Sequence, residues 1–156
     1  MPTTQRVVIR PPITPEEFER YYELRYKVLR MPLGMERDTA SDRYDNTGIR
    51  WHLAAFVGDT IVGVARMRRT KNRRYVINWV AVDPNQRRHG LGRILITTAE
   101  KIAINEGATA IELTSRNTAR GFYRKLGYVD IGEAPPIPNL SGYQIQTGQT
   151  YMKKEL

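Results

Sequence analysis

The hydrophobic pattern of the chain changes period between Arg74 and Gly107, and this change limits the folds that the chain can adopt. Arg74 to Val82 is apolar on both faces over its second half, as in a central strand that is covered on both sides. Apolar residues then recur at helical spacing, and Gly107 stands where a C-cap glycine is typical. The residues on this helical face are Leu91, Ile94, Leu95, Thr98 and Ile102. A buried strand followed by an amphipathic helix indicates an α/β fold.

The residues before this unit predict a strand, a helix and a long connection. Val7 to Arg10 is predicted to be a short strand. Thr14-Pro15-Glu16-Glu17 combines an N-cap threonine, an N1 proline and a capping-box glutamate, so a helix should begin here and run to about Leu29. Met31 to Arg50 contains turn formers and charges without a clean period. We expect a loop there, with one short helix at most.

The other segments predict a hairpin and a C-terminal series of strands. His52 to Val57 and Thr60 to Met67 are rich in β-formers and flank Gly58-Asp59, which is a hairpin signal. The remaining expected elements are strands over Ala110 to Thr114, Tyr128 to Ile131 and Tyr151 to Lys153, a short helix over Thr118 to Leu126, and a Pro-rich loop over Ala134 to Leu140. This order predicts an α/β sandwich with one parallel pair of strands, joined by the long helix as a crossover.

Composition narrows the class of protein. A chain of 156 residues fits a single domain, spanning residues 1–156, and 40% hydrophobic with 26% charged residues is ordinary for a folded protein. No apolar run approaches membrane length and Met1 to Arg10 has no signal-peptide core, so we expect a cytoplasmic protein without a membrane partner. The absence of cysteine excludes disulfides and a thiol nucleophile, and no metal-binding cluster is evident. A net charge of +9 favours anionic partners such as nucleic acid, acidic proteins or a phosphorylated cofactor.

The turn between the buried strand and the long helix has the properties of an anion site. The first backbone N–H groups of a helix have no partner and lie at the positive end of its dipole, so a pyrophosphate can accept hydrogen bonds from them. Gly90 and Gly92 would let the phosphates approach, and Arg87, Arg88 or Arg93 could add charge-assisted bonds. A G-x-G at a helix start serves capping or packing more often than phosphate binding. The segment is neither a P-loop nor the three-glycine fingerprint of dinucleotide folds.

This turn resembles the coenzyme A signature of the GNAT acetyltransferases, Gln/Arg-x-x-Gly-x-Gly/Ala, with Arg87, Gly90 and Gly92 in its three defined places. Arg116 to Tyr128 is similar to a second block of that superfamily, Asn-x-x-Ala-x-x-Phe-Tyr-x-Lys-Leu-Gly-Phe, although Arg116 stands in the usual Asn position. Together the blocks make the resemblance specific over roughly Ile77 to Ile131. It implies the acyl-CoA N-acyltransferase fold, in which a mixed central sheet of six to seven strands is flanked by about four helices.

The resemblance also implies an activity, a co-substrate and a set of site residues. Acetyl-CoA would donate its acetyl group to a primary amine of a small molecule or protein by direct attack through a tetrahedral intermediate. Tyr123 occupies the position of the general acid, although packing or a bond to the cofactor sulfur is the alternative role. The residues expected to bind the cofactor are Val80, Ala81, Val82, Arg87, Arg88, His89, Gly90, Leu91, Gly92, Arg93, Arg116, Asn117 and Tyr123.

The general base and the acceptor remain open at this point. Candidates for the base are His52, Glu112, Asp45 and Tyr44, each with an ordinary structural role as the alternative. The acceptor cleft should be lined by Met31 to Arg50 and Ala134 to Thr150. Asp38, Asp42 and Asp45 could favour a cationic acceptor, or they could belong to a solvated acidic loop.

The alternative to an enzyme is a catalytically idle module of the same fold that binds acyl-CoA or RNA. Tyr123 and the glycine loop argue against idleness, and the aromatic platforms that RNA binding would need are not evident, so we do not expect nucleic acid as a partner. Asp42-x-Tyr44-Asp45 after Arg25 is faintly similar to acyl-homoserine lactone synthases, which are longer. The resemblance allows a homodimer, because dimers are common in the superfamily.

Overall fold

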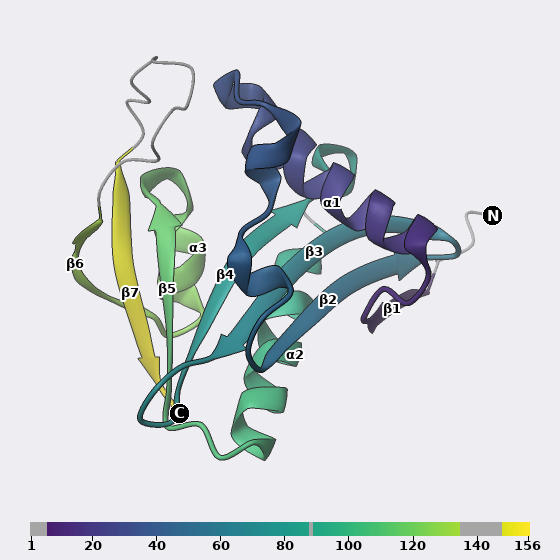
Figure 1. Cartoon of the computed structure of the whole chain (residues 1–156). Helices are drawn as coiled ribbons and strands as arrows, with labels where there is room; N and C mark the ends of the chain where they lie inside the picture. Colours follow the sequence, from purple (N-terminus) through teal and green to yellow (C-terminus); the bar gives the residue numbers. More distant parts are fainter. Residues whose placement is uncertain (1–5, 88, 135–147) are drawn as a thin grey trace.

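A seven-stranded sheet with helices on both faces forms the centre of the molecule (Figure 1). The computed structural model describes residues 6–87, 89–134 and 148–156. The strands lie in the order β1-β2-β3-β4-β5-β7-β6, and all neighbours are antiparallel except β4 and β5. Their bounds are β1 (Val7–Arg10), β2 (Arg50–Val57), β3 (Thr60–Arg69), β4 (Arg74–Val82), β5 (Ala110–Arg116), β6 (Val129–Ala134) and β7 (Gln149–Glu155).

Three α-helices pack on this sheet: α1 (Pro15–Leu29), α2 (Leu91–Asn105) and α3 (Arg120–Lys125). Helix α1 covers β3 and β4 on one face, while α2 covers β2, β3 and β4 on the other, with α3 beside β5 (Figure 1). Alternate residues of β2 enter the two cores: Leu53 and Ala55 join the cluster under α2, and Ala54 and Phe56 join the cluster under α1. No helix in this described part of the chain is long and apolar enough to span a membrane.

Helix α1 begins and ends where its sequence predicts. The Glu17 amide donates to Thr14 Oγ1 at 3.1 Å, and the Glu17 side chain accepts from the Thr14 amide to complete the capping box. The hairpin prediction is also confirmed, because β2 and β3 pair antiparallel through a turn at Gly58, whose φ is 59°. Both strands extend two residues further than expected, to Arg50 and Arg69.

The connection after α1 differs from its prediction of one short helix at most. It contains three 3-10 turns: η1 (Met31–Leu33), η2 (Arg37–Ala40) and η3 (Arg43–Asp45). In η3 the Tyr44 amide donates to Asp42 Oδ1 and the Asp42 amide donates to Asp45 Oδ2, at 2.9 and 2.8 Å. Such short-range bonds need no hydrophobic period, so the periodicity of the sequence does not reveal them.

The C-terminal elements follow the predicted order with shifted bounds. The helix expected over Thr118 to Leu126 is a 3-10 turn, η5 (Asn117–Ala119), followed by α3. A further 3-10 turn, η4 (Pro84–Gln86), precedes α2. The sheet agrees with the expected six to seven strands, whereas the described residues contain three α-helices rather than about four. Beyond Ala134, the expected Pro-rich loop lies outside the described residues.

The parallel strands β4 and β5 separate halfway along their length. They pair from Arg74↔Ala110 to Ile77↔Leu113, although both strands continue beyond these pairs. On the other side of β4, Ala65 of β3 lies opposite two residues, Trp79 and Val80, so β4 contains a β-bulge. Trp79 has a φ of 59°, which is uncommon for a bulky residue. The strands therefore diverge and open the sheet (Figure 1).

Candidate functional site

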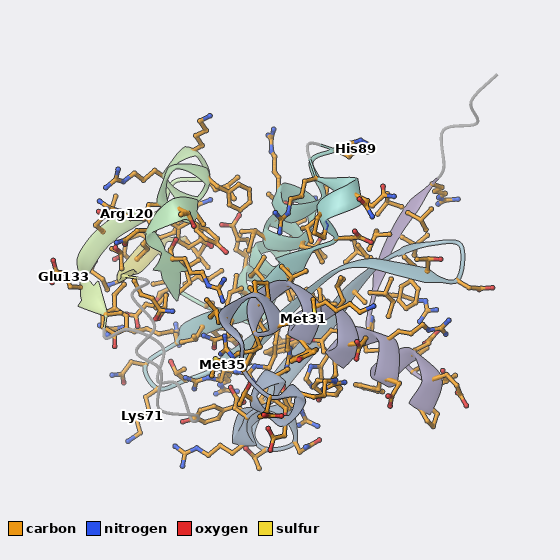
Figure 2. All side chains as sticks on the ribbon, turned by 90° about the horizontal axis from the view of Figure 1, so that it is seen from above. Met31, Met35, Lys71, His89, Arg120 and Glu133 are labelled. Atoms are coloured by element: carbon orange, nitrogen blue, oxygen red, sulfur yellow. The ribbon has the colours of Figure 1, made fainter. Side chains whose placement is uncertain are left out.

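A cleft of about 1030 Å³ occupies the opening between β4 and β5. Its walls come from Val80 to Val82 on β4 and Thr114 to Arg116 on β5. The cleft reaches both faces of the sheet, because its lining includes the end of α1 on one face and the start of α2 with α3 on the other. Figure 2 shows these faces edge-on, with Met31 and Met35 on the α1 side and His89 and Arg120 on the α2 side.

The start of α2 forms one end of the cleft. Gly90 is the N-cap with a φ of 73°, a left-handed conformation that glycine adopts without strain, and no side chain of the described residues caps the helix. The leading amides of α2 therefore remain available to an anion, beside Arg87 and Arg93 of the lining. Leu91 lies in the lining as well.

The other residues of this loop have different positions. Gly92 lines the cleft, but a Cβ there would lie 3.1 Å from Phe122 Cζ, so this glycine also allows α2 and α3 to pack closely. His89 is exposed at the rim of the molecule (Figure 2) and does not belong to the lining. Arg88 lies outside the described residues.

The edge of β4 that faces the cleft has no partner strand in β5 beyond Ile77. Val80, Ala81 and Val82 all belong to the lining, and they follow the last β4–β5 pair at Ile77. An extended ligand can therefore add to β4 through main-chain hydrogen bonds, as peptides add to exposed sheet edges.

Tyr123 is the one tyrosine in the described lining of the cleft. The side chain is 7% exposed, and its ring packs edge-on against Phe122 and Tyr128, with centroids 5.0 and 5.9 Å away. Its hydroxyl has no hydrogen-bond partner among the described residues. Burial raises the pKa of Tyr123 above its ordinary value, so the phenol stays protonated at neutral pH.

The structure separates the two residues expected at the end of β5. Arg116 belongs to the cleft lining, and its Nη2 donates to the Leu29 carbonyl at 2.5 Å. Asn117 is absent from the lining: its amide donates to the Gly148 carbonyl, and its Oδ1 accepts from Thr150 Oγ1 at 3.0 Å. Asn117 thus joins η5 to the start of β7.

None of the four candidate bases lies in the described lining of the cleft. His52 is buried with Nδ1 3.0 Å from Tyr21 Oη and Nε2 2.9 Å from the Asp45 carbonyl, and burial lowers its pKa. Asp45 is buried between the guanidinium groups of Arg25 and Arg66. These contacts indicate structural roles for both residues.

Glu112 and Tyr44 make surface contacts instead. Glu112 pairs with Arg74 at 3.5 Å at the paired end of β4 and β5. Tyr44 is half-buried and accepts a hydrogen bond from Arg43, which lowers the pKa of the phenol.

Asp42 is the one carboxylate in the described lining, and it lies in the segment from Met31 to Arg50 that the sequence predicts to line the acceptor cleft. Its oxygens accept from the Arg66 guanidinium, the Tyr44 amide and Trp79 Nε1, the last at 3.1 Å. Burial favours the neutral acid, but the hydrogen bonds from Arg66 and Trp79 outweigh it and hold the pKa of Asp42 below its usual range. Because Arg66 neutralises this carboxylate, Asp42 holds Trp79 rather than presenting free charge to the cleft.

Trp79 and Arg30 are further cleft residues that no local motif signals. Trp79 belongs to an apolar strand, and Arg30 is one of many arginines. Their roles arise from contacts with residues distant in sequence.

Comparisons with known proteins agree with this architecture. A model of the Acetyltransferase (GNAT) family matches residues 14–128. YitI of Bacillus subtilis (strain 168), an uncharacterized N-acetyltransferase, is 26% identical over 131 residues, which cover 80% of this chain and 87% of YitI.

Two crystal structures show the same fold. ElaA of Escherichia coli has a TM-score of 0.79 at 18% identity, covering 97% of this chain and all of ElaA. An aminoglycoside 6'-N-acetyltransferase complexed with coenzyme A has a TM-score of 0.74 at 18% identity, covering 96% of each chain.

Proposed function

Because the chain belongs to the GNAT acetyltransferase family and is an acetyl-CoA-dependent N-acetyltransferase, we propose that it acetylates a primary amine inside the cleft between β4 and β5. The observation that carries this proposal is the path of the cleft through the sheet. It joins the uncapped start of α2 on one face to the end of α1 on the other, with Tyr123 in its lining. A cofactor and an acceptor can therefore approach the same point from opposite faces.

The proposed cofactor site uses the main chain more than side chains. The amides at the start of α2, with Arg87 and Arg93, would hold the pyrophosphate. Val80 to Val82 would pair with the pantetheine arm, because this part of β4 has no partner in β5. An N–H group of the same segment would stabilise the oxyanion as charge develops on the thioester oxygen.

The transfer needs no enzyme nucleophile. The acceptor ammonium loses one proton, and the amine lone pair then forms a bond to the thioester carbonyl carbon while the carbonyl electron pair moves to oxygen. Collapse of this adduct restores the carbonyl and breaks the C–S bond, and the nitrogen loses a second proton. The thiolate takes one proton from Tyr123, which water reprotonates, so the products are an amide, a free thiol and one proton.

Tyr123 is suited to this step because of its surroundings. Burial keeps the phenol protonated, and the same burial disfavours a thiolate beside it, so the pKa values of donor and acceptor shift in the same direction. The described lining contains no histidine and only the neutralised carboxylate of Asp42. We therefore assign the first deprotonation of the amine to solvent water.

Calorimetric titration with acetyl-CoA tests the cofactor site. We expect micromolar binding by the wild type and its loss in the double variant Arg87→Glu, Gly90→Asp, whose added carboxylates repel the pyrophosphate. Lys101→Glu is the matched control, since it changes an exposed charge on α2 outside the cleft lining. Absence of binding by the wild type at modest salt would contradict the proposal and favour the RNA-binding alternative. A positive result is followed by screening amines for release of free thiol.

A further inference from the structure

Two arginines meet at one carbonyl oxygen on the α1 side of the cleft. Arg30 directly follows α1 and Arg116 is the last residue of β5. Arg30 Nη1 and Arg116 Nη2 donate to the Leu29 carbonyl at 3.1 and 2.5 Å. Both residues line the cleft, and Met31 marks this face in Figure 2.

Neither guanidinium has a carboxylate partner among the described residues. Residues 1–5, 88 and 135–147 contain no Asp or Glu, so these parts of the chain have no acidic side chain to supply. Asp42, the acid of the lining, already accepts from Arg66, Tyr44 and Trp79. The charge of Asp42 acts on Arg30 only from a distance, so no contacting carboxylate among the described residues neutralises either guanidinium.

The two cations lie partly out of water and close to each other. Burial and the charge of Arg116 lower the pKa of Arg30 to about 10, and burial lowers the pKa of Arg116. Like charges in a partly buried site are unfavourable unless an anion joins them. An anionic group that enters the cleft removes this penalty.

Both guanidiniums belong to residues of the cleft lining and keep N–H groups that make no hydrogen bond within the described residues. Arg30 uses Nε and Nη1 for the Thr39 and Leu29 carbonyls, which leaves Nη2, while Arg116 uses only Nη2 among the described residues. None of the remaining nitrogens is a fully buried atom without a partner. A carboxylate has two oxygens with about four lone-pair directions, so it can accept from both arginines at once.

The position of Arg30 is fixed relative to the reaction centre. Its guanidinium lies over the Trp79 ring, 4.4 Å from the centroid, and Trp79 Nε1 donates to Asp42. Trp79 precedes Val80 at the bulge where β4 leaves β5. A group bound by Arg30 thus lies beside the segment proposed to hold the thioester.

We propose that Arg30 and Arg116 bind a carboxylate of the acceptor, so that the substrate is a small amine that also carries a carboxylate, such as an amino acid. This inference rests on the proposed function and names the substrate class of the same site. It assigns Arg116 to the acceptor instead of the cofactor, and it replaces the cationic acceptor considered for Asp38, Asp42 and Asp45. Asp42 and Asp45 are paired with Arg66, and Asp45 also with Arg25, so neither attracts a cation.

The test compares amines that carry an anionic group with matched amines in which that group is neutral or absent. L-Amino acids, their carboxamides and their decarboxylated amines are assayed for thiol release, with phosphoethanolamine and ethanolamine as the phosphate pair. We expect kcat/KM to be about 10- to 100-fold higher for some amino acids than for their carboxamides, as for loss of a charge-assisted hydrogen bond. Preference for the phosphorylated amine, or equal rates for acid and amide, overturns the inference.

Variants separate the acceptor from the cofactor. Arg30→Met and Arg116→Met should each raise the acceptor KM about 10- to 100-fold while the calorimetric Kd for acetyl-CoA stays within about threefold. Arg30→Lys should restore part of the preference for carboxylate-bearing acceptors, because lysine keeps the positive charge. This partial recovery would also exclude a folding defect as the cause of the raised KM in Arg30→Met. Arg37→Met is the control, since Arg37 lies outside the lining and pairs with Glu23. Weaker acetyl-CoA binding in Arg116→Met, with acceptor preference unchanged, contradicts the assignment.

The two proposals fail in different ways. If the wild type does not bind acetyl-CoA, the proposed function fails. If it binds acetyl-CoA but acetylates no carboxylate-bearing amine, only the present inference is overturned.

Discussion

Trp79 shows how single residues are constrained by the tertiary structure. A φ of 59° costs a bulky residue about 1–3 kcal/mol and persists only where its surroundings impose it. Here the indole donates to Asp42, and the guanidiniums of Arg25 and Arg30 lie 4.6 and 4.4 Å from its ring centroid. The β-bulge that opens the cleft is therefore held by residues of α1 and the following connection.

Removal of the Tyr123 hydroxyl tests the proposed chemistry at the scale of one residue. Tyr123→Phe should lower kcat about 100-fold with little change in the Kd for acetyl-CoA, because general acid catalysis typically contributes at least this factor. Since burial raises the pKa of Tyr123, wild-type kcat should not decline through loss of this proton up to about pH 10. Steady-state kinetics from pH 7 to 10 check both statements. Tyr128→Phe is the control, because the hydroxyl of Tyr128 donates to Glu100 outside the cleft lining. If Tyr123→Phe lowers kcat twofold or less, Tyr123 is not the general acid.

His52 should make stability depend on pH. Its folded pKa is lowered by burial, so below about pH 6.5 the unfolded chain binds a proton that the folded chain does not. Protonation then favours unfolding, and the contribution of His52 is complete above pH 6.5 and is lost as the pH falls. Thermal unfolding between pH 8 and 5 should show a smaller decline in Tm for His52→Gln than for wild type. His89 is exposed, and His89→Gln is the control, whose decline in Tm should equal that of wild type. If Tm declines equally in wild type, His52→Gln and His89→Gln, this account of His52 is wrong.

At the scale of elements, Gly63 sets the distance between α2 and the sheet. A Cβ at Gly63 would lie 2.9 Å from Leu95 Cδ1, and Leu95 is fully buried. Gly63→Ala should therefore lower the free energy of unfolding by about 1–3 kcal/mol through overpacking, as measured by urea denaturation. Gly132→Ala on β6 meets no atom within 4 Å and should be nearly neutral. Leu95→Val, combined with Gly63→Ala, should recover part of the lost free energy of unfolding, because it removes the atom that the new Cβ would contact. If the double variant recovers none of it, this clash is not the cause.

The elements also differ in how far their own sequence specifies them. The start of helix α1 was predictable because its capping box and proline are local signals. The connection after α1 was not, because η3 is made by local side-chain bonds and is held in place by Asp45, which pairs with Arg25 and Arg66 from distant parts of the sequence. Hydrophobic periodicity contains no information about such pairs.

For the whole molecule, acetyl-CoA should act as a stabiliser. The cleft exists only when β4, β5, α2 and α3 are assembled, so a ligand bound there favours the folded state. At 100 times its Kd the ligand should add about 2.7 kcal/mol, which corresponds to roughly 5–10 °C in Tm for a chain of this size. Differential scanning calorimetry of the wild type and Gly90→Asp checks this expectation. ATP at equal concentration is the anion control, and an equal shift with ATP would argue against a specific cofactor site.

The sequence by itself determined the order of strands and helices, the glycine-containing turn before α2 and the family resemblance, because each depends on residues that are close together along the chain. It also placed Tyr123, Arg87, Gly90 and Gly92 in their blocks, and the structure brings these four to one cleft. Only the tertiary structure decided that Arg116 enters the cleft while Asn117 does not, that His52 and Asp45 are buried, and that Arg30 meets Arg116 at Leu29. The physical reason is that charge balance and burial are set by neighbours in space, and those neighbours come from α1, β3, β4 and β5 together.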